Sequence, residues 1–221
     1  AGTNVQGYVA LIRQGRYGEA LDLIRQKIPL PGTLGRVCPA PCENACRRAD
    51  IDTPLAIREL KRFAADQVDL RELPVPEIEN RPEKVAVIGS GPAGLTVAFY
   101  LRLKGYPVTL FEMFDKLGGM LRVGIPDYRL PAEVLDSEID YLIRHGIETR
   151  IGVRFGKDFT LADLRAEGFS AIFLGIGAHD SIWMRIPGEE EAENVIDAVG
   201  FLRDVNLGRG TAPGKRVIVI G

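Results

Sequence analysis

Three cysteines are the residues in this sequence whose type and spacing point most directly to chemistry. Cys38, Cys42 and Cys46 are the chain's 3 cysteines, and they recur at every fourth residue. Thiolates grouped in this way bind iron–sulfur clusters or zinc. The chain's 2 histidines, His145 and His179, lie far along the sequence, so a local zinc site lacks a fourth ligand. The pattern favours an iron–sulfur cluster, with zinc and buried unligated thiols as the alternatives.

A glycine-rich turn is the second chemical signal. It follows the apolar run Val85–Ile88 and has the pattern G-x-G-x-x-G in the residues Gly89, Ser90, Gly91, Pro92, Ala93 and Gly94. Between a strand and a helix, such glycines permit a tight turn, a close approach of the backbone to a pyrophosphate, and close helix packing. Glu112, 18 residues after the last glycine, can accept hydrogen bonds from a ribose. The combination predicts a dinucleotide site that prefers FAD or NAD, because the acid repels the 2′-phosphate of NADP.

Two further features favour FAD at this turn. Pro92 and the doublet Gly118-Gly119, soon after the second apolar run, are typical of flavoproteins. The run Val217–Gly221 also repeats the strand-then-glycine pattern of Val85–Gly89, which predicts the start of a second nucleotide-binding fold. Chains with two such folds usually hold FAD in one and NAD(P)H in the other.

Hydrophobic periodicity predicts the elements that position these residues. Over residues 1–72 it is helical only, and the predicted helices are Val5–Ile12, Tyr17–Ile28 and Pro54–Leu70, with a break at Pro29, Pro31 and Gly32. Further on, the predicted strands are Val85–Ile88, Val108–Phe111, Ser170–Leu174 and Arg216–Ile220, and the predicted helices are Pro92–Lys104, Pro131–His145 and Asn194–Val205. Strands that alternate with helices indicate an α/β fold with a parallel sheet.

These patterns divide the chain into parts. Residues 1–72 are predicted to form a helical iron–sulfur domain, and the proline-rich residues 73–83 an extended linker. Residues 84–212 are predicted to form the N-terminal part of an FAD-binding domain, and residues 213–221 the first strand of an NAD(P)H-binding domain. The predicted fold class is thus a helical domain followed by a Rossmann-like α/β domain, truncated at the start of a second one.

Composition excludes several classes of protein. With 28 Lys and Arg against 30 Asp and Glu, the net charge of −2 gives no electrostatic basis for binding nucleic acid or an anionic membrane. The content of 46% hydrophobic and 26% charged residues is that of a folded globular protein. No apolar run approaches the roughly 18 residues of a membrane helix, and no signal peptide is visible. The few, clustered cysteines favour a reduced, cytoplasmic setting.

The sequence also resembles a known family. The segment Arg36–Cys46, RVCPAPCENAC, is similar to the iron–sulfur segment of the small (beta) subunit of glutamate synthase. Relatives of that subunit include the N-terminal half of dihydropyrimidine dehydrogenase and the flavoprotein subunits of NAD(P)H:acceptor oxidoreductases. The similarity covers essentially the whole chain and continues through Pro54–Ala64, Gly89–Gly94, Phe111–Gly119, Gly124–Pro131, Ile172–Ala178 and Ile186–Glu189.

The resemblance implies a fold and a role. The fold is a helical domain with two [4Fe–4S] clusters, then an FAD domain split by an inserted NAD(P)H domain. The role is to move electrons between NAD(P)H, FAD and clusters for a larger catalytic or electron-accepting subunit, with ferredoxin as another candidate acceptor. The implied cofactor residues are Ser90–Gly94 for the pyrophosphate, Glu112 for the ribose, Gly118, Gly119 and Arg129 along the FAD, Phe155 at the adenine, Gly175–Gly177 as a second glycine approach, and Cys38, Cys42 and Cys46 for the clusters.

The sequence departs from this family at three points. The family carries a further run of cysteines that would precede Ala1. In some relatives a side chain from the helix after the cysteines ligates one cluster, but the matching residue here is Lys61, whose ammonium cannot bind iron; neighbouring Glu59 is a possible substitute. The chain also stops at Gly221, so most of the expected NAD(P)H site lies outside it. A non-catalytic docking module and a stand-alone flavin-dependent reductase are the alternative functions.

Overall fold

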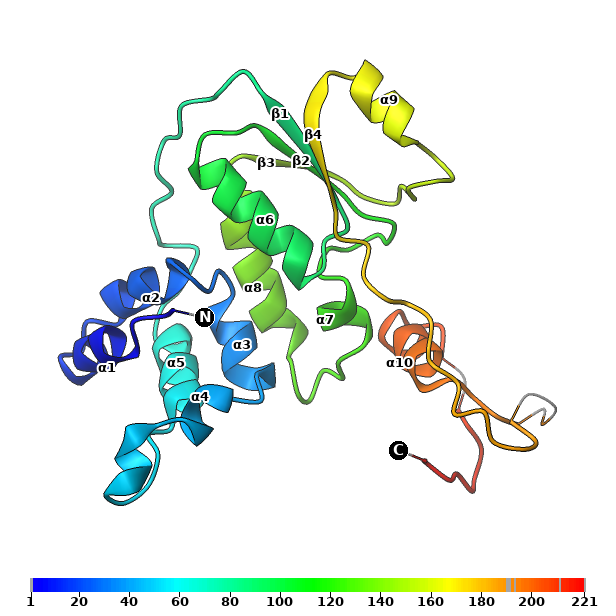
Figure 1. The fold of residues 1–221 in the computed structure, drawn as a ribbon, viewed down its shortest axis with the longest axis horizontal. Coiled ribbons are helices and arrows are strands. Elements are labelled where there is room, and N and C mark those ends of the chain that lie inside the picture. The colour runs from blue at the N-terminus through cyan, green and yellow to red at the C-terminus, as the bar shows by residue number, and fades with distance from the viewer. Residues whose placement is uncertain (1, 190–191, 193, 211, 221) are drawn as a thin grey trace.

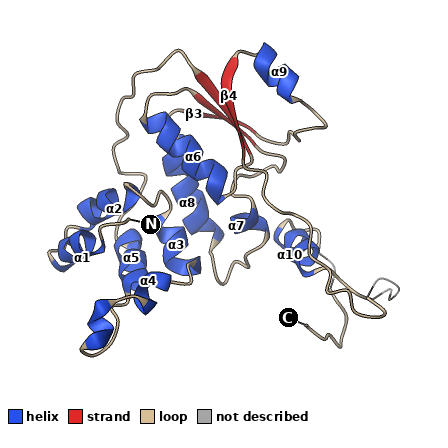
Figure 2. Cartoon of the chain, viewed as in Figure 1, coloured by secondary structure: helices blue, strands red, loops and turns tan. Residues whose placement is uncertain are grey.

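The structure, a computed structural model, describes residues 2–189, 192, 194–210 and 212–220 (Figure 1). Its N-terminal part consists of helices and loops (Figure 2). The elements are α1 (Val5–Arg13), α2 (Tyr17–Arg25), α3 (Pro31–Val37), α4 (Pro41–Asn44), the 3-10 helix η1 (Arg47–Asp50) and α5 (Ile57–Asp66). For the described residues 2–72, the prediction of helices alone is confirmed.

One helix of this region was not expected from the sequence. The break predicted at Pro29, Pro31 and Gly32 is present, since the helix predicted over Tyr17–Ile28 ends at Arg25, but it is short, because Pro31 is the first residue of α3. Proline fits this position because the first turn of a helix leaves its N–H groups without intrahelical partners, and proline's φ is already helical. The helix predicted over 54–70 is shorter than expected and spans only Ile57–Asp66, as α5.

The rest of the fold is built around a parallel sheet. Its strands are β1 (Lys84–Ile88), β2 (Val108–Phe111), β3 (Ile147–Arg150) and β4 (Phe169–Leu174), in the order β3-β2-β1-β4. Val87 of β1 lies opposite Leu110 of β2 and Phe173 of β4. The prediction of a parallel α/β fold is confirmed. The sequence analysis missed β3 because only its first residue is buried, so it lacks a continuous apolar run.

Helices cover the sheet unequally (Figure 2). α6 (Pro92–Leu103) and α8 (Ala132–Ile143) pack on each other and on the strands, whereas the short α9 (Leu161–Ala166) packs on β4. α7 (Met120–Val123) contacts both α8 and α10 (Ala198–Asn206). The helices predicted after the turn and before β3 are therefore confirmed as α6 and α8. The predicted helix over 194–205 begins later, where the Asp197 carboxylate accepts hydrogen bonds from the backbone of Val199 and Gly200.

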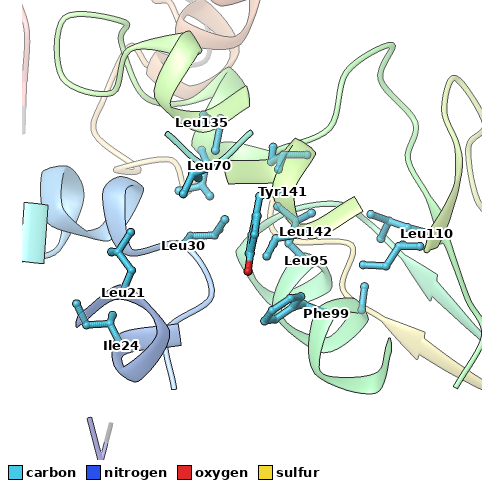
Figure 3. Close-up of a cluster of buried hydrophobic side chains, with 14 of the residues drawn as sticks. Leu21, Ile24, Leu30, Leu70, Leu95, Phe99, Leu110, Leu135, Tyr141 and Leu142 are labelled. Atoms are coloured by element: carbon cyan, nitrogen blue, oxygen red, sulfur yellow. The ribbon is translucent and has the colours of Figure 1, made fainter. Parts of the chain in front are cut away.

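The helical part and the sheet share one hydrophobic core (Figure 3). The helical part contributes Leu21, Ile24, Leu30 and Leu70, and the α/β part contributes Leu95, Phe99, Leu110, Leu135, Tyr141 and Leu142. Hydrogen bonds reinforce the junction, since the Arg144 guanidinium donates to the carbonyl oxygens of Leu70, Arg71 and Leu73. The connecting residues 73–83 form neither helix nor strand. The two regions are thus packed together in spite of the extended segment between them.

The strand predicted at Arg216–Ile220 is not formed. Residues 217–220 are between 55% and 88% exposed and have no regular secondary structure. A β-strand must pair its backbone N–H and C=O groups with a neighbouring strand to be stable. The described part of the chain places no strand beside this run, so its apolar sequence alone does not fold. The last residue of the predicted pattern, Gly221, lies outside the described residues.

Candidate functional site

The glycine turn after β1 is shaped by backbone packing. Gly89 has a φ of +97°, and a Cβ on it would lie 2.3 Å from the carbonyl oxygen of Gly175. A Cβ on Gly94 would lie only 1.8 Å from the carbonyl oxygen of Gly89. No side chain fits at either position without moving backbone. These glycines therefore let β1, β4 and the start of α6 approach one another closely.

Gly91 has a different environment, since a Cβ built on it would meet no atom within 4 Å. Gly91 caps α6, and Pro92 and Ala93 after it are exposed. The first N–H groups of a helix have no intrahelical partners, and the positive end of the helix dipole lies there. An open space in front of such a helix start suits a phosphate group. The structure therefore leaves room for a pyrophosphate at the position where the sequence predicts one.

A buried hydrogen-bond network lies behind this turn. The Glu112 carboxylate accepts hydrogen bonds from the Ser90 N–H (2.9 Å) and the Ser90 hydroxyl (2.5 Å) through one oxygen, and from the Phe114 N–H (2.9 Å) through the other. The Ser90 Oγ also accepts a hydrogen bond from the Gly118 N–H at 3.0 Å. Both side chains are buried. Ser90 and Glu112 thus hold the turn in place, a role that the sequence analysis did not identify.

Three of the other predicted glycines, Gly118, Gly119 and Gly175, contact the same turn. A Cβ on Gly119 would lie 2.7 Å from the Cα of Gly91, and the Gly175 N–H donates a hydrogen bond to the Ile88 carbonyl at 2.7 Å. We call the combined set the glycine cluster, and it comprises Gly89–Gly94, Gly118–Gly119 and Gly175–Gly177. The cluster lies where β1 and β4 end, which is where open α/β sheets bind their ligands.

Among the described residues, two predicted cofactor residues, Phe155 and Arg129, make no hydrogen bond to the glycine cluster. Phe155 is half-buried and packs on Phe159, with ring centroids 5.6 Å apart, and Phe159 packs on Phe111 of β2. The chain just before Phe155 is held to the end of β2, because the Val153 N–H donates to the Glu112 carbonyl. Arg129 is exposed, and in the described chain its side chain makes no hydrogen bond or ion pair.

His179 follows the last glycines of the cluster and lies against Phe114, with ring centroids 6.0 Å apart. Its Nδ1 is buried and has no hydrogen-bond partner among the described residues. The side chain is half-buried. The signal for this placement in the sequence is its position directly after the Gly175–Gly177 approach.

The cysteine segment, residues 38–46, lies in the helical part, between the end of α3 and the start of η1. Cys38 follows α3, Cys42 lies in α4 and Cys46 precedes η1. Ala40, between two prolines, has a φ of 54°, and its N–H donates to the Cys38 Sγ at 3.4 Å. Cys42 is exposed and the other thiols are half-buried.

The donor chemistry of the cysteine segment fits an iron–sulfur cluster. Thiols are the usual ligands of such clusters, and a backbone N–H already points to one sulfur. No set of three or more His, Cys, Asp or Glu side chains within the described residues is gathered closely enough to hold a metal ion. The cysteine segment therefore presents ligands of the right type without forming a closed ligand set.

α5 packs against the cysteine segment and brings a buried cation to it. The Arg58 backbone N–H donates to Glu43 (2.8 Å), and the Arg58 guanidinium donates to the Cys38 carbonyl (3.3 Å). Lys61, one turn further along α5, is only 7% exposed. Burial lowers the pKa of Lys61, while the side chains of Cys38 and Cys42 act in the opposite direction. Glu59, by contrast, is exposed and pairs with Arg58 at 2.8 Å.

A buried carboxylate connects the cysteine segment to the α/β part. Glu138 of α8 accepts hydrogen bonds from the backbone N–H groups of Gly32 (2.5 Å) and Thr33 (2.7 Å), at the start of α3. α3 ends directly before Cys38. Burial raises the pKa of Glu138, and its hydrogen bonds and the nearby Arg25 oppose that rise. The sequence analysis missed this residue, although an acid on the apolar face of a helix signals a buried polar contact.

Two protein-family models match the chain. Residues 1–72 match the family described as dihydropyrimidine dehydrogenase domain II, 4Fe-4S cluster. Residues 83–221 match the pyridine nucleotide-disulphide oxidoreductase family. The resemblance that the sequence analysis found is confirmed.

Within the described residues, no helix combines the length and the apolar character needed to cross a membrane.

Curated relatives match almost the whole chain but are much longer. The chain is 40% identical, over 99% of its length, to the NADPH-Fe(3+) oxidoreductase subunit beta of Geobacter sulfurreducens, and it covers 33% of that protein. It is 42% identical to the NADP(+)-dependent formate dehydrogenase subunit beta of Moorella thermoacetica, with 99% of the chain and 34% of that protein covered. For the glutamate synthase [NADPH] small chain of Mycobacterium tuberculosis, the identity is 36%, with 96% and 46% covered. The chain thus spans less than half the length of each.

Solved structures support the fold. Mycobacterium tuberculosis FprA in complex with NADPH aligns with a TM-score of 0.51 and 24% identity, over 57% of this chain and 29% of that one. At this identity, the likeness concerns the α/β fold alone.

Proposed function

The chain belongs to the pyridine nucleotide-disulphide oxidoreductase family and carries a 4Fe-4S domain of the dihydropyrimidine dehydrogenase type, and on this premise we propose that it is the electron-transfer flavoprotein part of an NADPH-linked iron–sulfur oxidoreductase. The observation that carries the proposal is the shared core. The glycine cluster and the cysteine segment are built on helices and strands that pack around one continuous set of buried side chains. Cofactors bound at the two places would keep a fixed separation.

The glycine cluster is the proposed FAD site. The backbone N–H groups at the start of α6 would bind the pyrophosphate, and Glu112 would accept hydrogen bonds from the ribose. Each carboxylate oxygen can accept more than one hydrogen bond, so the internal role of Glu112 is compatible with this one. The proposed FAD residues are Gly89, Ser90, Gly91, Pro92, Ala93, Gly94, Glu112, Gly118, Gly119, Arg129, Phe155, Gly175 and Gly177.

The cysteine segment is the proposed cluster site, with Cys38, Cys42 and Cys46 as ligands. Further ligands would come from residues beyond this set, because the described chain holds no closed set. When bound, FAD accepts two electrons as a hydride and passes them singly to iron–sulfur clusters. The names of the three curated relatives favour NADPH as the donor.

We extend the proposal to domains, partners and location. The proposed boundaries are 1–72 for the cluster domain, 73–83 for the linker, 84–212 for the FAD domain and 213–221 for the start of the NAD(P)H domain. A larger subunit is the proposed partner, because relatives are named as beta subunits or small chains. Ferredoxin is a second candidate acceptor. Free cysteines favour a cytoplasmic location, and the net charge favours neither nucleic acid nor membrane as a partner.

An absorption spectrum tests this function first. The intact protein is purified without oxygen, its iron and acid-labile sulfide are measured, and NADH and then NADPH are added. We expect flavin bands, a broad cluster shoulder and bleaching by NADPH. Flavin without iron or sulfide would indicate a simple flavin reductase, and the absence of both cofactors from folded protein would indicate a docking module. Either result overturns the proposal.

A further inference from the structure

Lys61 is a largely buried lysine that forms no ion pair among the described residues. Its side chain lies on α5, which packs against α3 and α4, and it is 7% exposed. In the part of the chain that the structure describes, no carboxylate forms an ion pair with it. The buried part is mainly the aliphatic stem, because the Lys61 Nζ is not one of the fully buried atoms without a partner. An anion close to Lys61 would nevertheless interact strongly with its charge, since the surrounding helices exclude most of the solvent.

The cysteine segment would supply such an anion once its thiols ligate a cluster, and α5 packs against it. Arg58, one turn before Lys61, reaches the Cys38 carbonyl oxygen at 3.3 Å, so this face of α5 points to Cys38. Burial lowers the pKa of Lys61, and the side chains of Cys38 and Cys42 are the first two groups that oppose this lowering. Glu138 contributes less, and its oxygens already accept the Gly32 and Thr33 N–H groups.

We propose that the Lys61 ammonium is a counter-charge for the iron–sulfur cluster bound through Cys38 and raises the reduction potential of that cluster. The inference rests on the proposed function, because it requires a cluster at Cys38. Reduction adds one electron, and hence one negative charge, to the cluster. A cation held nearby in a medium of low dielectric constant stabilises the reduced form more than the oxidised form. Lys61 is thus a positioning and tuning residue, not an iron ligand.

The Ala40 N–H acts in the same direction. It donates to the Cys38 Sγ at 3.4 Å, and hydrogen bonds to ligand sulfur also raise cluster potentials. Cys38 therefore receives a fixed dipole from the loop and a full charge from α5. This asymmetry makes the cluster at Cys38 easier to reduce than a cluster held by exposed thiols, and it would favour that cluster as an electron acceptor.

A potentiometric titration followed by electron paramagnetic resonance tests the inference. The intact protein is compared with Lys61→Met, which keeps the length of the side chain and removes the charge, and with Lys61→Arg, which keeps the charge. Arg62→Met is the matched control, because Arg62 is on the same helix but is half-exposed and pairs with Asp66 at 3.5 Å. Iron and sulfide content is measured for every variant.

We expect Lys61→Met to make one cluster about tenfold harder to reduce, which for one electron is about 59 mV towards lower potential. Lys61→Arg should keep the wild-type midpoint, and Arg62→Met should change it much less than Lys61→Met. A Lys61→Met protein with full iron and an unchanged midpoint would overturn the inference.

Loss of iron is also informative. If Lys61→Met loses iron and Lys61→Arg retains it, Lys61→Met is reconstituted with iron and sulfide before the titration, and an unchanged midpoint in the reconstituted protein would overturn the inference. If both variants lose iron, the shape of the lysine matters rather than its charge, and the inference fails. Wild-type protein without iron and sulfide would overturn the proposed function as well, so the two failures are distinguishable.

Discussion

At the glycine cluster, the atoms that shape the site belong to backbone and to one buried pair, Ser90 and Glu112, and they contact one another without any ligand. In the cysteine segment, the atoms that would hold a ligand belong to side chains, of which Cys42 is exposed. The first site is fixed by packing before a cofactor arrives. The second contains the largely buried Lys61 and, at Ala40, a non-glycine residue with left-handed backbone. In the proposed function, a cluster would therefore complete the second site, whereas FAD would only occupy the first.

The largest expected effect comes from a substitution that disrupts the packing of the glycine cluster. Gly94→Ala would place a Cβ 1.8 Å from the Gly89 carbonyl oxygen, so β1 and α6 must separate. We expect a loss of about 3 kcal/mol in the free energy of unfolding, measured by urea unfolding of cofactor-free protein. Gly18→Ala is the control, since a Cβ there meets no atom within 4 Å. Equal stability of the two variants would contradict the packing argument.

The second prediction concerns the link between the sites. Glu138→Ala removes the acceptor of the Gly32 and Thr33 N–H groups, which are then buried without partners. We expect a loss of about 2 kcal/mol, together with faster hydrogen exchange of both amides. Glu133→Ala, on an exposed position of the same helix, should have little effect. Unchanged exchange in Glu138→Ala would show that the cap is dispensable.

The third prediction separates cofactor binding from folding. Gly91→Ala adds a Cβ to the open space in front of α6, so it should change stability by less than about 0.5 kcal/mol. It should weaken FAD binding at least about tenfold, or about 1.4 kcal/mol, in a titration followed by flavin fluorescence. Gly18→Ala again serves as the control. Wild-type affinity in Gly91→Ala would place the pyrophosphate elsewhere.

The smallest effect sharpens the contrast at the cysteine segment. Ala40 has a φ of 54°, a conformation that costs an alanine more than a glycine. Ala40→Gly should therefore stabilise the cluster-free protein by about 0.5 kcal/mol, because relief of strain exceeds the entropy cost of glycine. Ala162→Gly, in the ordinary helix α9, should destabilise it by about 0.5–1 kcal/mol. Calorimetry of both variants measures these changes in stability. A loss of stability in both variants would contradict backbone strain at Ala40.

Local patterns predicted the parts of this molecule that depend on neighbouring residues. Val85–Ile88 and the glycines after it specify a strand and a turn through their own sterics, and the structure confirms both. Glu138 could not be predicted as the cap of α3, because its partners are more than 100 residues earlier in the chain. Val217–Ile220 has the sequence of a buried strand, but a strand also requires a neighbour.

The shared core has a consequence for how such proteins can be cut and recombined. The extended residues 73–83 look like the natural place to separate the cysteine-bearing helices from the sheet. A cut there would expose Leu30 and Leu70 on one piece and Leu135 and Tyr141 on the other. It would also leave the Glu138 carboxylate without the two backbone N–H groups that donate to it. Both pieces would then tend to aggregate. A transplantable unit must carry α8 along with the cysteines, so the boundary of exchange lies inside the sheet domain and not at the proline-rich segment.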